Sequence, residues 1–469
     1  MEFPYGKAPF WILVLAVLAG VGLAGVQIRR GPRADLILVT FAKDHVPGHM
    51  AAAEAFYKKT GKRVEIQLVD GSALYRRLSA AMQSGSTQPD MVELVEGSLG
   101  QFTRGPLADV GFVDLTDRVK GEGWDEKLVS SRFSLWSSRG RIFAVPHDVH
   151  PVMLAYRRDI VEKLGIDVKK LTTWDEFTRV GREVVTKDLN GDGVPDRYML
   201  DLDSGGGSPV QILMLQRGLP VLDESGAVRF DTPEVGELIE WYIKQVSINS
   251  PGRIAFSAGW GQNLSRAMTD GLVLFYFCPD WRTKGFAQDI AAVSGKMALM
   301  PLPAWKEGGL RTSTWGGTGL AITKACKDPE LAWEFAKYVY YKEEFLPARY
   351  LSNNILPPLK SSWSMPEMAE RDPFFSNQQR GLEYAKLAPQ TPAKYLTAFQ
   401  TLADSKLNEA FVNSLSHYNS NGEAGLREFI DAELKRTATQ VRQQIDRNQF
   451  LRAPAAGAGS GASVGEVRP

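Results

Sequence analysis

The chain has 469 residues, of which 44% are hydrophobic and 23% are charged, and its formal net charge is +1. These proportions are those of an ordinary globular protein, and the length exceeds what a single core usually serves, so we expect two lobes. A net charge near zero provides no field to attract nucleic acid, and no basic patch is interleaved with aromatic residues. Nucleic-acid binding is therefore not expected.

The N-terminus begins with an apolar segment. Ala8 to Ile28 carries no charged residue and is long enough to cross a bilayer as a helix. We expect residues 1–34 to be a membrane anchor or a signal segment, and the length of the run favours an uncleaved transmembrane anchor. No cysteine lies nearby, so a lipid-modified N-terminal cysteine is not expected. At the other end, the Ala/Gly/Ser-rich residues 453–469 are predicted to be disordered.

From Asp35 the sequence alternates strand and helix patterns. Short apolar runs at Leu36–Phe41, Val64–Leu68 and Met91–Val95 are separated by two helical segments. This β-α-β-α-β order predicts parallel strands joined by right-handed crossovers, hence a doubly wound α/β lobe. In such sheets the ligand binds beyond the carboxyl ends of the strands. The residues at those ends are Lys43, Asp44 and His45 after the first strand and Glu96 after the third.

The stretch from Arg139 to Asp159 consists of two apolar β-runs separated by a polar break. Pro146 and Pro151 lie in the break, and proline cannot donate to a sheet ladder, so one continuous central strand is not expected. We predict that the chain leaves one sheet here and enters another, with Asp148 at the crossing. A ligand cleft forms where two lobes meet in this way.

Further helices and strands follow this crossing. Helical patterns cover Thr173–Lys187 and Pro233–Gln245, and apolar β-runs cover Val273–Phe277 and Met297–Leu302. Trp315–Thr323 is a glycine-rich turn that leads into another strand. The remaining chain, to about residue 451, is predicted to be mainly helical.

Seven segments between Leu36 and Tyr341 occur in a characteristic order. They are AAEAFYKKTGKRVEI, LSAAMQSGSTQPDMVEL, GPLADVGFVDLTD, GRIFAVPHDVHPVMLAYRRDIVEKLGI, DGLVLFYFCPDW, KMALMPLP and WGGTGLAITKACKDPELAWEFAKYV. In this order the chain resembles the extracellular solute-binding proteins of ABC importers, in the sugar-binding branch that includes maltose-binding protein.

The resemblance implies a periplasmic-binding-protein fold, in which two α/β lobes joined by hinge crossings close on a solute. Residues 35–148 and 282–327 would form the first lobe, and residues 149–281 and 328–452 the second. Such proteins have no catalytic residues; they deliver a carbohydrate to the permease subunits of a transporter, which reads the closure. The resemblance also implies an extracytoplasmic location, periplasmic or at the cell surface, and a monomer.

Aromatic faces and planar polar groups are the side chains that bind sugars. Trp281 follows a strand where the family commonly has a ring-stacking aromatic residue, and Asp148 matches its acidic position after the proline. An Asx turn and simple lobe packing are the alternative roles. The predicted ligand-binding residues are Lys43, Asp44, His45, Glu96, Asp148, Trp260, Trp281, Trp315 and Gly316.

Four of the five histidines form the pairs His45/His49 and His147/His150. The spacing of the first pair places both rings on one face of a helix, but a zinc-type site needs three or four converging ligands. A receptor or sensor for a metal or another solute is therefore an alternative function, beside a chance clustering of polar loop residues. A carbohydrate-active enzyme with paired carboxylates such as Asp148 and Glu96 is a further alternative, although no nucleophile elbow, P-loop or HExxH motif is present.

A separate motif resembles the start of a calcium-binding loop. Oxygen-bearing residues alternate along it with a glycine at the sixth position, whereas Met199 stands where a bidentate acid is expected. We predict a structural Ca²⁺ there, the alternative being a hydrophilic turn. Its ligands would be Asp188, Asn190, Asp192, Val194 and Asp196.

The chain has only two cysteines, Cys278 and Cys326. Two are too few for a cysteine-based zinc site. We expect two buried thiols rather than a disulfide.

Overall fold

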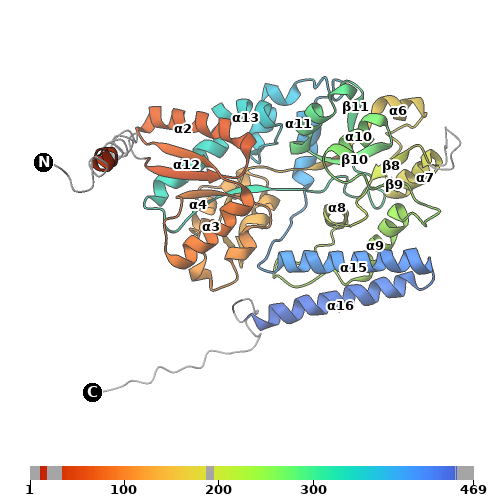
Figure 1. Cartoon of the computed structure of the whole chain (residues 1–469). Helices are drawn as coiled ribbons and strands as arrows, with labels where there is room; N and C mark the ends of the chain where they lie inside the picture. The colour runs from red at the N-terminus through yellow and green to blue at the C-terminus, as the bar shows by residue number, and fades with distance from the viewer. Residues whose placement is uncertain (1–10, 18–33, 186–194, 449, 451–469) are drawn as a thin grey trace, which may run out of the picture.

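The computed structural model of the chain describes residues 11–17, 34–185, 195–448 and 450. Two lobes lie side by side, one around the N-terminal strands and α2 and the other around β8, β10 and α9 (Figure 1). Each lobe has its own five-stranded sheet. The predicted two-lobed α/β fold is thus confirmed.

The first sheet has the strand order β2-β1-β3-β12-β6. Its first three strands are parallel, as predicted from the β-α-β-α-β pattern, whereas β12 runs antiparallel to both of its neighbours. The strands are β1 (Leu36–Thr40), β2 (Val64–Leu68), β3 (Met91–Val95), β6 (Val145–Pro146) and β12 (Thr318–Ile322).

Helices cover both faces of the first sheet. α2 (Val46–Thr60) and α12 (Pro329–Tyr341) share one buried apolar cluster with the sheet, and α3 (Gly71–Ser84) packs on the other face. α2 ends at Gly61, whose φ of 74° is the left-handed conformation that glycine adopts without strain. Asp328 caps α12 by accepting a hydrogen bond from the backbone N–H of Leu331 at 3.0 Å.

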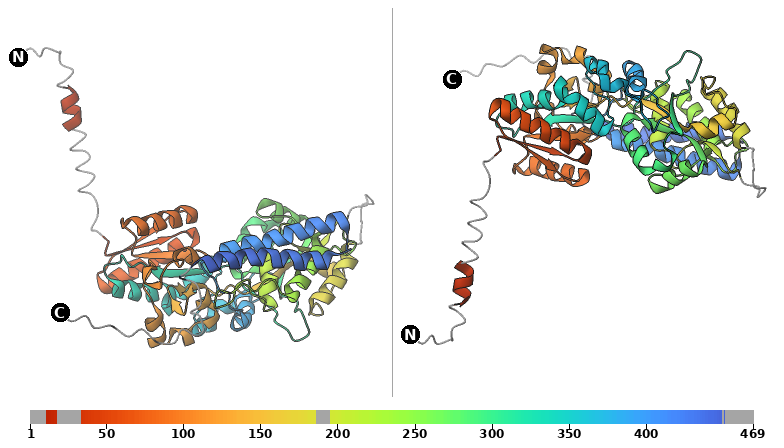
Figure 2. Two further views of the ribbon diagram at one scale, coloured as in Figure 1. Left: turned by 90° about the horizontal axis from the view of Figure 1, so that it is seen from below. Right: turned by 90° about the horizontal axis from the view of Figure 1, so that it is seen from above.

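The second sheet has the order β11-β7-β10-β8-β9. β10 is parallel to β8 and antiparallel to β7, so this sheet is mixed as well. The strands are β7 (Val152–Arg157), β8 (Tyr198–Asp201), β9 (Ala255–Phe256), β10 (Val273–Pro279) and β11 (Met297–Pro301). The long C-terminal helices α15 (Gln400–Asn421) and α16 (Leu426–Arg447) lie side by side along this lobe (Figures 1 and 2). They pack on α9 (Pro233–Val246) and share one buried apolar cluster with the sheet.

The remaining helices and strands are short or moderate in length. They are α4 (Thr116–Gly121), α5 (Trp124–Lys127), β4 (Ser137–Ser138), β5 (Arg141–Ile142), α6 (Arg158–Lys163), α7 (Trp174–Val185), α8 (Ser208–Gln216), α9 (Pro233–Val246), α10 (Gln262–Asp270), α11 (Asp280–Asp289), α13 (Leu346–Asn353) and α14 (Arg380–Leu387).

Two segments belong to the opposite lobe from the one predicted from the sequence. β11 was predicted to belong to the first lobe, within residues 282–327, but it pairs with β7 in the second sheet. α12 was predicted in the second lobe, within residues 328–452, but it packs on α2 and β12. In both cases the element type follows from local pattern, whereas its sheet is chosen by distant apolar partners.

The predicted crossing between lobes is confirmed. β6 belongs to the first sheet and β7 to the second, and residues 147–151 connect them. A second connection returns between β11 and β12, and Pro151 forms an antiparallel bridge with Thr314 where the two connections meet. His150 has a φ of 56°, so the backbone turns sharply at the crossing.

Little of the predicted N-terminal segment lies within the described residues. Residues 11–17 are helical and most of their apolar side chains are exposed. Among the described residues, no helix combines the length and the apolarity needed to span a bilayer. The rest of residues 1–33 and the predicted tail at 453–469 lie outside the described residues.

Candidate ligand-binding cleft

A cavity of about 430 Å³ lies between the two lobes. The loop after β3, the N-terminal half of α8, the second crossing and the segment leading to α15 all contribute to its wall. Three of the predicted ligand-binding residues, Glu96, Trp315 and Gly316, line this cavity. Its position beyond the carboxyl end of β3 is the one expected for a ligand site in a parallel α/β sheet.

A polar network bridges the lobes at this cavity, and we call Glu96, Gln211 and Lys394 the cleft cluster. The Lys394 ammonium donates to the Glu96 carboxylate, and its Nζ lies 3.1 Å from Oε1 of Gln211 on α8. Burial alone would raise the pKa of Glu96, but the adjacent Lys394 charge holds this pKa below its ordinary value. The cleft cluster therefore presents a carboxylate, an amide and an ammonium group, all able to bond hydroxyl groups.

Asp404 adds a second carboxyl group to the cavity wall. Its Oδ1 accepts a hydrogen bond from Nε2 of Gln400 at 2.7 Å, and burial raises its pKa. Sequence reasoning missed Gln211, Lys394 and Asp404. Each is a common surface residue type within a helix or loop, and no local pattern distinguishes it from a solvated side chain.

Three predicted tryptophans form one aromatic cluster beside the cavity. The ring centroids of Trp260, Trp281 and Trp315 lie 5.7 to 6.3 Å from one another. Trp281 Nε1 donates to the backbone carbonyl of Trp315 at 2.9 Å, which orients the Trp281 ring, and Trp260 is 57% exposed. Partly exposed indole faces held in this way are suited to stacking on an apolar ring face.

The structure places Asp148 in a buried ion pair at the crossing and not on the cavity. Its carboxylate accepts from Nη2 of Arg132 at 3.1 Å and from the backbone N–H of Thr318 at 2.8 Å, and the Nε2 of His150 lies 3.0 Å away. Burial alone would raise the pKa of Asp148, but His150 and Arg132 hold it well below its ordinary value. Because these donors occupy both oxygens, Asp148 stabilises the crossing between the lobes.

His150 extends this network into the second lobe. Its Nδ1 lies 2.6 Å from the Asp280 carboxylate at the start of α11, and Asp280 also accepts from the backbone N–H of Leu356 at 2.6 Å. Burial alone would lower the pKa of His150, but the Asp148 and Asp280 carboxylates raise it to about 9. We call Arg132, Asp148, His150 and Asp280 the hinge cluster.

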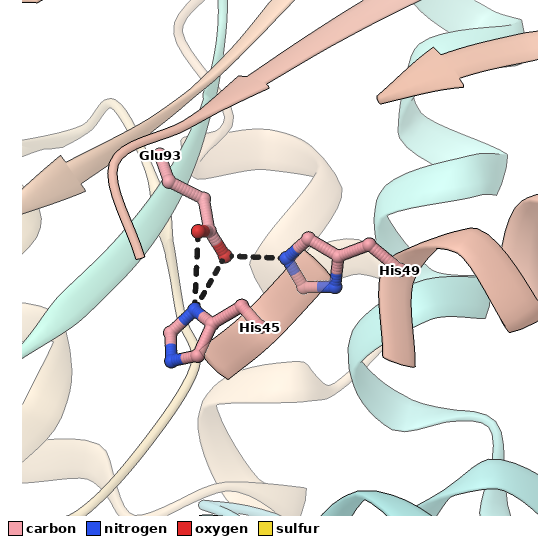
Figure 3. A group of neighbouring side chains, drawn as sticks. All are labelled: His45, His49 and Glu93. Atoms are coloured by element: carbon pink, nitrogen blue, oxygen red, sulfur yellow. Dashed lines mark hydrogen bonds and ion pairs between the residues drawn. The ribbon is translucent and has the colours of Figure 1, made fainter. Parts of the chain in front are cut away.

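The predicted ligand-binding residues that follow β1 differ in their exposure to solvent. Lys43 and Asp44 are exposed on a single 3-10 turn, whereas His45 points inward and is buried. His45 and His49 both contact the carboxylate of Glu93, a residue on β3 that sequence reasoning missed (Figure 3). A single glutamate within the apolar run Met91–Val95 was the signal that could have revealed it.

Most of the predicted calcium loop, including Asp188, Asn190, Asp192 and Val194, lies outside the described residues. Asp196 is described and partly buried, shortly before β8. The calcium site stays a prediction. Cys278 and Cys326 are buried free thiols, as expected.

Two lobes, each with its own sheet, linked by crossings and enclosing a polar cavity with aromatic residues beside it, define a solute-binding protein of the periplasmic type. The comparisons agree. Residues 43–344 match the family described as bacterial extracellular solute-binding protein, and the chain belongs to this family.

Among characterised relatives, the arabinooligosaccharide-binding protein of Halalkalibacterium halodurans is 27% identical over 350 residues, which cover 73% of this chain and 75% of the relative. The arabinooligosaccharide-binding protein of Bacillus subtilis is 23% identical, with 80% and 86% covered. The structure of the sugar-binding protein MalE from Xanthomonas citri superposes with a TM-score of 0.70 at 17% identity, covering 88% of this chain and 99% of the other. At 17% identity the superposition shows that the two proteins share a fold.

Proposed function

We propose that this protein captures a carbohydrate, a mono- or oligosaccharide, in the cavity between its lobes and delivers it to an ABC importer. The observation that carries the proposal is the placement of the Trp260–Trp281–Trp315 cluster next to the cleft cluster. Sugar rings present C–H faces that stack on indoles and hydroxyl groups that bond carboxylates, amides and ammonium groups. The relatives named for arabinooligosaccharides and lactose support the same ligand class.

The ligand would act by exchanging partners. In the structure Lys394 is bound to Glu96 of the first lobe and lies close to Gln211 of the second. Hydroxyl groups of a sugar could replace these contacts, so that the ligand bonds to Glu96 on the first lobe and to Gln211 on the second. A ligand that contacts both lobes favours the closed arrangement that a transporter recognises.

The placement of the carboxylates favours binding without catalysis. Asp148 lies in the hinge cluster and Glu96 is paired with Lys394, so the two are not available as a free acid and base on one substrate. We further propose that the protein acts outside the cytoplasm, held at the membrane by residues 1–34. Fractionation of cells that produce the full chain would test this, and release of a shortened protein would contradict the anchor.

The central test is calorimetry of the full chain against a panel of arabino-, galacto- and malto-oligosaccharides, with product analysis by chromatography. We expect a heat of binding for at least one sugar and no product. Trp260→Ala should weaken this binding by about 30-fold, because a tryptophan face that a ligand covers contributes on the order of 2 kcal/mol. Trp124→Ala, in a tryptophan of the first lobe that packs on Tyr341, is the matched control.

Turnover of a sugar, or equal affinity in the two tryptophan variants, would contradict the proposal. A circular dichroism spectrum of each variant verifies that the fold persists.

A further inference from the structure

A compact group of metal-binding side chains lies in the first lobe, away from the cavity. The Nδ1 of His45, the Nε2 of His49 and a carboxylate oxygen of Glu93 all lie within 4.8 Å of one another (Figure 3). Their side chains are only 5%, 1% and 0% exposed. Because a solute could not reach them without opening the lobe, an ion held here would be resident and not cargo.

The spacing of these atoms fits a transition metal ion. His45 Nδ1 lies 3.1 Å from Oε2 of Glu93, and His49 Nε2 lies 2.8 Å from Oε1. Ligand atoms bonded at roughly 2.0–2.2 Å to one tetrahedral ion stand about 3.3 Å apart. The two histidine–carboxylate distances are close to this value, and all three ligand atoms lie within 4.8 Å of one another.

Neighbouring hydroxyl groups hold the carboxylate in position. Tyr340 Oη donates to Oε1 of Glu93 at 2.6 Å, and the hydroxyl of Thr40 donates to Oε2. Hydrogen bonds of this kind orient the ligands of metal sites and tune their affinity. The nearby Arg349 guanidinium donates to the backbone carbonyls of Val339 and Tyr340.

An independent observation comes from His147 at the crossing. Its ring is fully buried and stacks on the His45 ring at 4.2 Å between centroids. Its Nδ1 lies 3.5 Å from Asp148, and within the described residues neither ring nitrogen makes a hydrogen bond.

A buried imidazole without hydrogen bonds is costly, by about 1–3 kcal/mol for each unsatisfied group. The Nδ1 of His49 is also buried without a partner among the described residues. The unpartnered His147 ring beside His45 is hard to explain as part of a self-sufficient hydrogen-bonded cluster, and it is accounted for if the polar core is built around an ion that one of its nitrogens binds.

We propose that His45, His49 and Glu93 bind a divalent transition metal ion of the Zn²⁺ class, with His147 or a water molecule in the fourth position. Two nitrogen ligands and one carboxylate suit Zn²⁺, whereas Ca²⁺ and Mg²⁺ prefer oxygen-only sites. The ion fastens the start of α2 to β3, next to the crossing that carries His147. It is structural and independent of the sugar site.

The test is Zn²⁺ titration of the full chain after treatment with a chelator, read by calorimetry and by elemental analysis of the dialysed protein. We expect one Zn²⁺ per chain and a higher melting temperature with the ion. Glu93→Gln and His49→Gln should weaken binding by more than about 100-fold. His417→Gln changes the one histidine on α15, outside the group, and should bind as the wild type does.

X-ray absorption on the wild type decides the matter even if the variants fold poorly. A first shell with at least two imidazole ligands supports the proposal. A shell of oxygen atoms only, an absence of stoichiometric Zn²⁺, or equal binding by wild type and Glu93→Gln would overturn it. Tyr340→Phe retains all three ligands and should weaken binding by about 10–100-fold.

Discussion

Glu93 and Glu96 are three residues apart at the end of β3, yet they belong to different environments. Glu93 is fully buried and accepts bonds from Tyr340, Thr40 and two histidines, whereas the side chain of Glu96 is 15% exposed at the cavity and is paired with Lys394. A polar group whose partners are all protein groups supports the fold. A polar group that faces a cavity can exchange a protein partner for a ligand.

The hinge cluster and the cleft cluster differ in the same way. Asp148 and Arg132 are each 1% exposed, and their pairing connects the first crossing with the second through the carbonyl of Gly316. Removing one member of a buried pair leaves an uncompensated charge. Changes in the hinge cluster should therefore affect stability, and changes in the cleft cluster should affect binding.

The largest expected effect is that of Asp148→Ala. It leaves Arg132 and His150 without their shared carboxylate, and we expect the free energy of unfolding to fall by about 3–5 kcal/mol. Urea unfolding followed by circular dichroism measures this. Asp270→Ala removes an exposed partner of Arg266 and should change stability by less than about 0.5 kcal/mol. Similar values for the two variants would show that the buried Asp148 pair contributes no more to stability than an exposed ion pair.

The second prediction concerns pH. Because folding raises the pKa of His150 to about 9, from about 6.5 in the unfolded chain, its stabilising contribution is complete below pH 6.5 and is lost as pH rises through 9. We expect a loss on the order of 2–3 kcal/mol in unfolding free energy between pH 6 and 10. The difference between wild type and His150→Gln isolates this effect from other titrating groups. A difference that does not vary with pH would show that His150 is not held charged.

The third prediction is for the cleft cluster. Lys394→Met removes the ammonium group but retains most of the side-chain volume, and we expect sugar affinity to fall by about tenfold with a stability change below about 1 kcal/mol. Calorimetry and urea unfolding on the same samples measure the two quantities. A large loss of stability with unchanged affinity would assign Lys394 to the fold.

The smallest expected effect concerns the predicted calcium loop. If Ca²⁺ is tenfold above its Kd, it should stabilise the protein by about 1.4 kcal/mol, which a chelator such as EGTA removes. Asp192→Ala should abolish the difference in melting temperature with and without Ca²⁺, whereas Asp270→Ala should retain it. If the chelator leaves the wild-type melting temperature unchanged, the loop is a turn without an ion.

Much of the fold could be predicted because its signals are local. Apolar runs identified β1, β2, β3 and β10, and the prolines at 146 and 151 identified the crossing. The sheet to which β11 belongs could not be predicted, because its partner β7 is separated from it by more than a hundred residues of intervening chain. Sequence pattern specifies an element, and packing between distant segments specifies its neighbours.

The candidate site was predictable where residues follow strands. Glu96, which follows β3, was found on this basis, whereas Trp315 was found in the glycine-rich turn that leads into β12; both residues line the cavity. Asp148 was placed at the crossing correctly, but its partner Arg132 lies in a 3-10 turn that carries no motif. Without that arginine, a buried ion pair and a ligand-binding carboxylate have the same appearance in the sequence.

The order in which segments complete the two lobes has a consequence for synthesis of the protein. The first sheet needs β12, which ends at Ile322, and the apolar cluster of the second lobe is completed by α16, which packs on α9 and ends at Arg447. At 5–20 residues per second, roughly 20 to 90 seconds pass before the last of these helices exists. Until then the face of α9 that α16 covers lacks this partner, so the core of the second lobe is the last to be completed.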